Sequence, residues 1–221
     1  MATAALSRDT LADTAARAVR NMIVDGTLPA GARVNEVHLA ARLGISRTPL
    51  REALAGLERE GALSNRPRIG WFVEPLTLEE LADLYPIRAL LDPEALRLAG
   101  LPSPARLRAL AQLNGRIGRE SDADAVIALD DEWHRLLIAG CPNRALLDLI
   151  DTFILRTRRY EVALMRERRN VAVATGGHEA VMAALRDGDL AAACAALKAN
   201  LQHGFAPIAA WLAERETKET A

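Results

Sequence analysis

The chain has 221 residues, half of them hydrophobic, so it can form one large or two small domains whose core needs no disulfide bonds. Its two cysteines, Cys141 and Cys194, show no paired spacing, which indicates a reducing compartment. No apolar run is long enough to span a bilayer, and the N-terminal residues lack a signal-peptide pattern. We therefore expect a cytoplasmic protein without membrane contact.

The net charge of −1 conceals an uneven distribution. Residues 1–75 carry ten arginines against eight acidic residues, whereas residues 76–221 carry 18 basic against 21 acidic residues. Six arginines and only three acids fall between Arg42 and Arg68. A basic N-terminal segment is a weak indication of a nucleic-acid-binding module joined to a second domain.

The apolar spacing predicts a first helix over residues 11–23 and a second, short helix after Asn35, which is a favourable N-cap. Gly44 stands where a helix-ending glycine is expected. The apolar side of the short helix is predicted to consist of Val37, Leu39 and Leu43.

A third helix is predicted after the turn Gly44-Ile45-Ser46, with Ser46 as its N-cap and Pro49 in its first turn. Its buried stripe is predicted to be Leu50, Leu54 and Leu57. Two short helices joined by such a turn form a helix-turn-helix, whose second helix enters the major groove of DNA.

The exposed side of this third helix begins with Arg47, Thr48 and Arg51. Arg47 and Arg51 are one turn apart, so both guanidinium groups project from the same corner. Arginine can bind guanine O6 and N7 bidentately, and Thr48 with the free N–H groups of the first turn suits a phosphate. The alternative is an ordinary solvated face, although the acids typical of such a face come only later in this helix.

Residues 62–64 and 71–73 are predicted to be two short strands around a tip that contains Arg66, Arg68 and Gly70. A basic hairpin tip can lie along a phosphate backbone or enter a minor groove. Together with the helix-turn-helix, this hairpin predicts a winged-helix domain over residues 1–75.

The run ISRTPLREAL from Ile45 to Leu54, the LExEG that follows it and the GxFV of the hairpin resemble the GntR family of winged-helix regulators. Some members of that family carry an arginine where this chain has Val37, so no base contact is implied there. The residues that the resemblance places at double-stranded operator DNA are Arg47, Thr48, Pro49, Arg51 and Gly70.

After a linker at residues 74–76, the chain is predicted to form an all-α bundle over residues 76–221, whose interior can hold a ligand. Thr77 begins a capping box, and Pro86 is predicted to kink or interrupt the first helix. Gly176-Gly177 is one of the predicted breaks. Six helices are expected, over residues 77–99, 103–119, 122–140, 143–167, 175–187 and 189–214.

Polar residues on apolar helix faces indicate a metal site in this bundle. Asp130 and His134 lie one turn apart on one helix, and His178 and Asn200 lie on the inner faces of two later helices. One carboxylate with imidazoles from separate helices suits a divalent metal. The alternative is that each is an ordinary hydrogen-bonded core or surface residue.

This half of the chain is similar to the FCD domain of the FadR subgroup, an all-helical bundle that often holds zinc, nickel or manganese. The resemblance implies that Asp130, His134 and His178 are ligands and that Asn200 replaces a fourth, histidine ligand. Because an amide oxygen is the weaker ligand, we expect metal to bind loosely or only with an effector carboxylate completing its coordination. His203, one turn further on, leaves the inner stripe and is a poor substitute.

Arg88 lies on the inner stripe of the first bundle helix, and the FCD resemblance implies a pocket-facing arginine near this position. Together with a metal, Arg88 can bind a small organic acid effector bidentately. The alternative is an internal salt bridge, for example with Asp130. A cluster of further arginines is expected to form mainly a solvated face: Arg156, Arg158, Arg159, Arg166, Arg168 and Arg169.

The sequence thus predicts a mainly α protein with a winged helix at residues 1–75 and a helical bundle at residues 76–221. The predicted function is a metabolite-responsive transcription regulator without enzymatic activity, which binds a palindromic operator as a homodimer. Two alternatives remain open: a metal-dependent hydrolase built on the bundle, and a DNA-binding protein whose C-terminal domain only dimerises.

Overall fold

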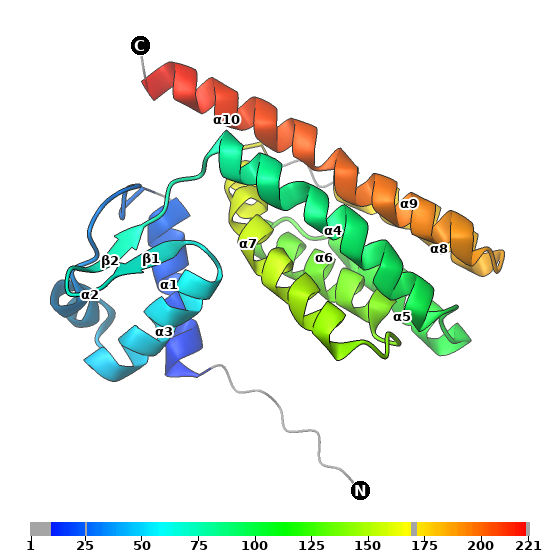
Figure 1. The fold of residues 1–221 in the computed structure, drawn as a ribbon, viewed down its shortest axis with the longest axis horizontal. Helices are drawn as coiled ribbons and strands as arrows, with labels where there is room; N and C mark the ends of the chain where they lie inside the picture. Colours follow the sequence, from blue (N-terminus) through cyan, green and yellow to red (C-terminus); the bar gives the residue numbers. More distant parts are fainter. Residues whose placement is uncertain (1–9, 25, 169–171, 220–221) are drawn as a thin grey trace, which may run out of the picture. The chain divides into compact units, whose positions relative to one another are not determined.

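The computed structural model describes residues 10–24, 26–168 and 172–219 (Figure 1). Its helices far outnumber its strands, so the mainly α fold class is confirmed. The chain divides between Pro75 and Leu76 into two compact units, and each is described by itself. Within the described ranges, no helix is long and apolar enough to cross a membrane.

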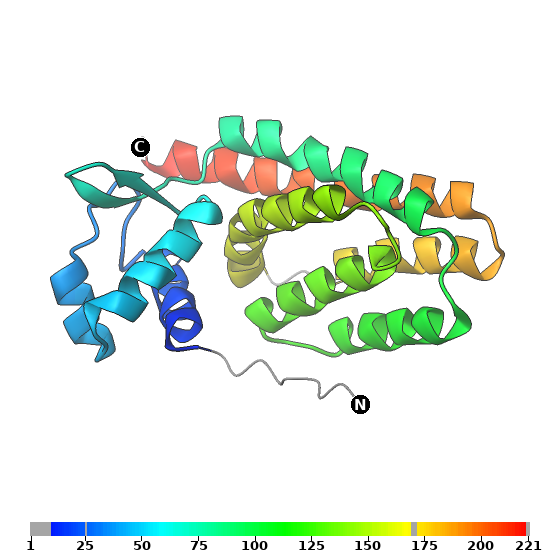
Figure 2. The same ribbon diagram turned by 60° about the horizontal axis from the view of Figure 1, so that its bottom comes forward.

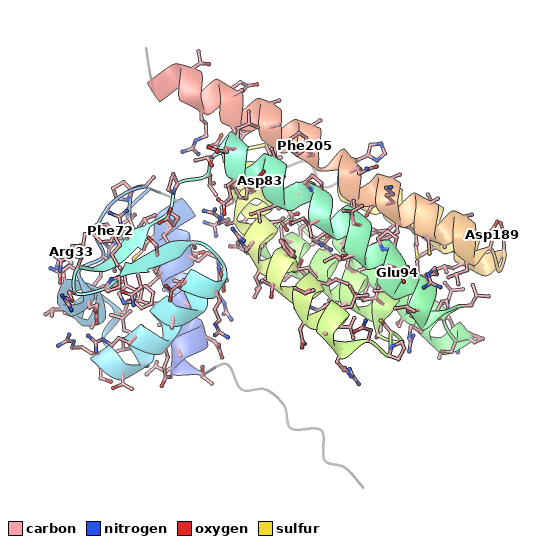
Figure 3. All side chains as sticks on the ribbon, viewed as in Figure 1. Arg33, Phe72, Asp83, Glu94, Asp189 and Phe205 are labelled. Atoms are coloured by element: carbon pink, nitrogen blue, oxygen red, sulfur yellow. The ribbon has the colours of Figure 1, made fainter. Side chains whose placement is uncertain are left out.

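The N-terminal unit is a winged helix. It contains the helices α1 (Leu11–Val24), α2 (Glu36–Leu43) and α3 (Arg47–Arg59), and the strands β1 (Leu63–Arg66) and β2 (Gly70–Val73). The strands pair antiparallel, from Leu63 opposite Val73 to Arg66 opposite Gly70. Arg33 adds a single bridge to Phe72, and both residues are labelled in Figure 3. The core joins all of these elements through Val19, Leu39, Leu54, Leu63 and Trp71.

Local capping fixes the helix-turn-helix. The Asn35 side chain accepts hydrogen bonds from the N–H groups of Val37 and His38, and Gly44 ends α2 with φ +66°, a conformation that favours glycine. Ser46 precedes α3 but, among the described residues, accepts no capping hydrogen bond through its side chain.

The expected burial of Val37 is wrong, because its side chain is 64% exposed and the buried residues of α2 are Leu39 and Ala40. Two residues in an α-helix rotate by about 200°, which places Val37 almost opposite Leu39.

The C-terminal unit is a helical bundle (Figure 2). Trp133, Ile154, Val181 and Leu197 lie at its centre and come from four different helices. Its helices are α4 (Leu78–Ala99), α5 (Pro104–Ile117), α6 (Ala123–Ile138), α7 (Arg144–Arg168), α8 (Ala172–Arg186), α9 (Leu190–His203) and α10 (Phe205–Glu219).

The predicted interruption at Pro86 and the predicted break at Gly176-Gly177 do not occur. α4 continues through Pro86 without interruption, because its packing against α7 and α9 compensates for the hydrogen bond that proline cannot make. Gly176-Gly177 lies inside α8. At Gly177 a Cβ atom would collide with the Asn200 amide, so glycine there serves close helix packing.

The single helix predicted over residues 189–214 is also wrong, because α9 ends at His203 and α10 begins at Phe205. The break falls where Pro207 lacks the N–H that would donate to the His203 carbonyl. Gly204, between the two helices, leaves the space that the Tyr85 hydroxyl occupies.

Candidate functional site

The N-terminal end of α3 presents an exposed basic corner. The Arg47 and Arg51 side chains are both 60% exposed, Thr48 is exposed between them, and Pro49 is half-buried. Glu36 was not anticipated here: Arg51 Nε donates to its Oε2 at 2.6 Å, and Arg47 Nη2 lies 3.8 Å from the same oxygen. Exposed ion pairs are weak, so a phosphate or a base edge can replace Glu36 as the partner of either arginine.

The tip of the β-hairpin carries two exposed arginines. The Arg66 guanidinium lies 4.0 Å from the centroid of the Phe72 ring, which restricts its motion. Arg68 adopts φ +66°, unusual for a residue other than glycine, and Gly70 has φ +113°, which a side chain would strain. The turn therefore holds both guanidinium groups on an exposed tip and depends on glycine at position 70.

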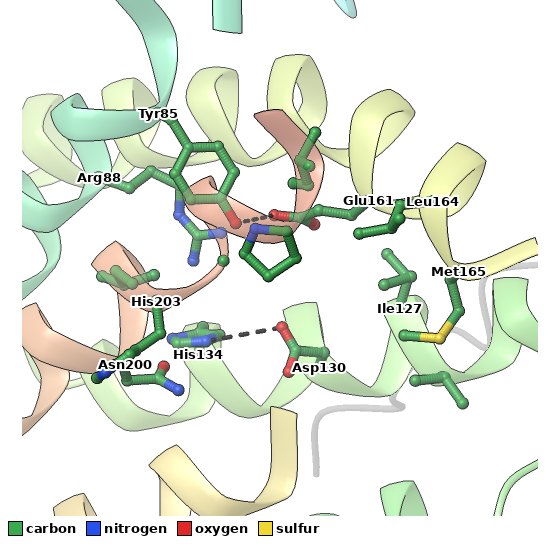
Figure 4. A pocket seen from close by; sticks show the side chains of 15 residues that line it. Tyr85, Arg88, Ile127, Asp130, His134, Glu161, Leu164, Met165, Asn200 and His203 are labelled. Atoms are coloured by element: carbon green, nitrogen blue, oxygen red, sulfur yellow. Dashed lines mark hydrogen bonds and ion pairs between the residues drawn. The ribbon is translucent and has the colours of Figure 1, made fainter. Parts of the chain in front are cut away.

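In the bundle, a cavity of about 350 Å³ lies among α4, α6, α7, α9 and α10 (Figure 4). Its volume suits a small molecule. The residues that line it are Tyr85, Arg88, Val126, Ile127, Asp130, His134, Glu161, Leu164, Met165, Asn200, Leu201, His203, Gly204, Pro207 and Ile208.

Asp130 and His134 on the cavity wall come together with His178 of α8. One potential ligand atom from each lies within 4.8 Å of the other two, the only such cluster among the described residues. His134 Nε2 lies 3.6 Å from Asp130 Oδ2, and His178 Nε2 lies 3.3 Å from Asp130 Oδ1. Both imidazoles are buried, so this carboxylate and two rings from α6 and α8 form a compact three-residue cluster.

The surroundings of His178 orient its ring. Its Nδ1 lies 3.0 Å from Asn114 Oδ1, an acceptor, so Nδ1 carries the proton and Nε2 keeps its lone pair. Trp133 stacks on the ring at a centroid distance of 3.7 Å. Buried Nε2 has no hydrogen-bond partner within the described ranges. A histidine that donates one N–H to an oxygen and directs the other nitrogen at a carboxylate has the arrangement of a metal ligand.

The electrostatics fit a metal as well. Burial lowers the pKa of His178 to about 3, and burial with the Arg88 charge lowers the pKa of His134 well below its usual value. Burial, with the nearby Glu161, raises the pKa of Asp130 to about 7. Neutral imidazoles are the form that binds metals, and a cation between them would offset the cost of ionising Asp130.

Asn200 and His203 both line the cavity, but they differ in packing and in exposure to solvent. The Asn200 amide lies against Gly177 of α8, the helix that also carries His178. His203 is largely exposed and does not belong to the cluster found among the described residues.

Arg88 is only 4% exposed and lines the cavity from α4. Its Nη2 donates to Asp92 Oδ2 at 3.1 Å, so the internal salt bridge is with Asp92 rather than Asp130. The Arg88 Nε atom is buried without a hydrogen-bond partner in the described part of the chain. Arg88 therefore combines a structural ion pair with a position on the cavity wall.

Sequence reasoning missed Tyr85, Asn114 and Glu161. The Tyr85 hydroxyl donates to Glu161 Oε1 at 3.5 Å, and the two side chains point toward one another in Figure 4. Burial raises the pKa of both groups. Glu161 follows Ile154 and Thr157 on the inner stripe of α7, a helical spacing that could have identified it.

The arginines of α7 are less solvated than expected. Arg156 pairs with Glu80 at 3.1 Å, and Arg159 pairs with the same carboxylate. Arg158 pairs with buried Asp131, and Arg166 pairs with Asp124. The Arg168 side chain and Arg169 lie outside the described residues.

Two family models match the chain: the FCD domain over residues 83–203, and the gntR family of bacterial regulatory proteins over residues 11–73. Together they cover the cavity-bearing bundle and the helix-turn-helix with its hairpin.

Individual relatives agree. The Nta operon transcriptional regulator of Aminobacter aminovorans is 38% identical over 131 residues, 58% of this chain and 62% of that protein. The HTH-type transcriptional regulator BphR of Paraburkholderia xenovorans is 30% identical over 191 residues, 78% of this chain and 73% of that protein. The solved structure of E. coli McbR/YncC has a TM-score of 0.71 at 25% identity and covers 90% of this chain and 97% of that protein.

Proposed function

Because the chain belongs to the GntR family of bacterial regulatory proteins and contains an FCD domain, we propose that it is a metabolite-responsive transcription regulator of the FadR subgroup. It binds double-stranded operator DNA in the cytoplasm, as a homodimer on a palindromic site. The observation that carries this proposal is the exposed basic corner of α3, with Arg47 and Arg51 on one face.

In this proposal, Arg47 and Arg51 contact base edges, while Thr48 and the N-terminal N–H groups of α3 contact phosphate. Pro49 shapes the first turn of α3. Arg66 and Arg68 bind the DNA backbone or minor groove from the hairpin, at a tip whose path requires Gly70.

The bundle is the sensor. Asp130, His134 and His178 hold a divalent metal: zinc, nickel or manganese. The amide oxygen of Asn200, which also lines the cavity, is the candidate for a fourth ligand. When bound, the metal supplies positive charge that attracts the carboxylate of a small organic acid. Arg88 binds the same carboxylate from α4. The dimer adopts two arrangements that differ in their affinity for the operator. The effector binds one arrangement more tightly than the other, so it shifts the population between them and changes operator affinity.

The cavity also bears on one of the alternatives. A domain that only dimerises has no need of a 350 Å³ cavity lined by buried charges.

Selection of duplexes from a random pool with the wild-type protein supplies an operator for testing. We expect Arg47→Ala and Arg51→Ala each to weaken operator binding by about tenfold to hundredfold, as loss of a bidentate base contact does. Arg59→Ala, which removes an exposed charge from the other end of α3, is the matched control. Unchanged binding by both corner variants would refute the DNA-binding assignment.

A further inference from the structure

Glu161 plays no part in the proposed metal site or in binding an organic acid, yet it is one of the charged residues on the cavity wall. Its only hydrogen bond among the described residues is the long one, 3.5 Å, from the Tyr85 hydroxyl. A buried carboxylate is costly unless it is paired or well hydrogen-bonded. The Glu161 carboxylate is thus available to a ligand.

The cations near Glu161 already have carboxylate partners. Arg88, whose charge acts on Glu161, is hydrogen-bonded to Asp92. Arg158, the other cation that acts on Glu161, forms an ion pair with Asp131. Neither arginine therefore cancels the charge of Glu161 in full.

The charge balance of the cavity then constrains the ligand. With Arg88 balanced by Asp92, the carboxylates of Asp130 and Glu161 contribute two negative charges when both are ionised, and a divalent metal at the cluster would cancel both. A simple organic acid would add an uncompensated buried negative charge, whereas a zwitterion would add none.

We propose that the effector is an amino acid or a similar amino-carboxylate, whose carboxylate binds the metal and Arg88 and whose ammonium group binds Glu161. Tyr85 is a positioning residue, because its hydroxyl holds the Glu161 carboxylate at the cavity. This inference rests on the proposed sensor function and narrows its ligand from acids in general to zwitterions.

The test compares acids that differ only by an amino group, with the full-length, Zn²⁺-loaded protein and isothermal titration calorimetry. The probe pairs are propionate and alanine, succinate and aspartate, and glutarate and glutamate. In at least one pair we expect the amino member to bind about tenfold to hundredfold more tightly, the range for a charge-assisted hydrogen bond.

Glu161→Gln keeps the size of the side chain and removes its charge, so it should bring the paired affinities to within about twofold. Tyr85→Phe should reduce the preference in part. Asp148→Asn removes an exposed carboxylate from the same helix and should leave the preference intact. Operator binding by each variant checks that the protein is folded.

Equal binding of both members of every pair by the wild type would overturn the inference while leaving acid sensing in place. A preference for the amino member that survives Glu161→Gln would also overturn it. If no probe of either kind binds, the acid-sensing function and this inference fail together.

Discussion

The two units use charged side chains in opposite ways. In the winged helix, Arg47 and Arg51 are 60% exposed and share a single carboxylate, that of Glu36. In the bundle, Arg88 and Asp92 are almost completely buried and paired with each other. An exposed arginine can exchange its partner for DNA at little cost, whereas a buried charge depends on whatever compensates it. DNA binding should thus be sensitive to salt, and the stability of the bundle to the removal of single charges.

The largest effect should come from breaking the buried pair. Arg88→Met leaves Asp92 charged and unpaired in the core, which should lower the free energy of unfolding by about 3–5 kcal/mol. Urea denaturation followed by circular dichroism measures the loss. Arg97→Met is the control, because Arg97 forms an exposed pair with Glu94 at 2.6 Å, and it should change stability little. Equal losses in both variants would contradict the contrast between buried and exposed pairs.

A smaller effect should follow from releasing the His178 ring. Asn114→Ala removes the oxygen that fixes the protonation of Nδ1, so Zn²⁺ affinity should fall by about tenfold to hundredfold. Competition with a chelating dye measures the affinity. Asn143→Ala, at the exposed start of α7, should leave Zn²⁺ affinity unchanged. An unchanged affinity in Asn114→Ala would mean that His178 does not bind the metal.

The smallest effect should come from the exposed corner of the winged helix. Glu36→Gln frees Arg51 and Arg47 from their shared carboxylate, so affinity for non-specific duplex DNA should rise modestly at low salt. The slope of log affinity against log salt should steepen by about one unit or less. A fall in affinity would show instead that Glu36 orients the arginines for binding.

How far the sequence predicts the molecule depends on how local the determining contacts are. Asn35 and Gly44 mark the two ends of α2 through contacts with neighbouring residues, and the sequence predicts both positions. The polar groups of the bundle depend on partners far apart in the chain: Tyr85 contacts Glu161 on the cavity wall, and Asn114 contacts His178 of the three-residue cluster. The spacing of residues along the sequence does not predict such contacts, because they depend on how the helices pack against one another.

Differences within single helices have local causes. A proline alone does not decide where a helix ends, because α4 continues through Pro86 whereas α9 and α10 are separate helices beside Pro207. Val37 was assigned to the buried face although it lies opposite Leu39 on the helix. Helical periodicity placed Asp130, His134 and His178 on inner helix faces, and the three side chains do lie together.

The central claim is that exposed charges on one unit bind DNA while buried polar groups on the other bind a metal. Parallel measurements on Arg51→Ala and His134→Ala test it most directly: zinc content by elemental analysis, and operator affinity of the metal-free proteins by fluorescence anisotropy. We predict that Arg51→Ala binds the operator about tenfold to hundredfold more weakly and keeps its zinc. We predict that His134→Ala loses zinc and keeps operator binding. Wild-type operator affinity in Arg51→Ala, or wild-type zinc content in His134→Ala, would contradict the account.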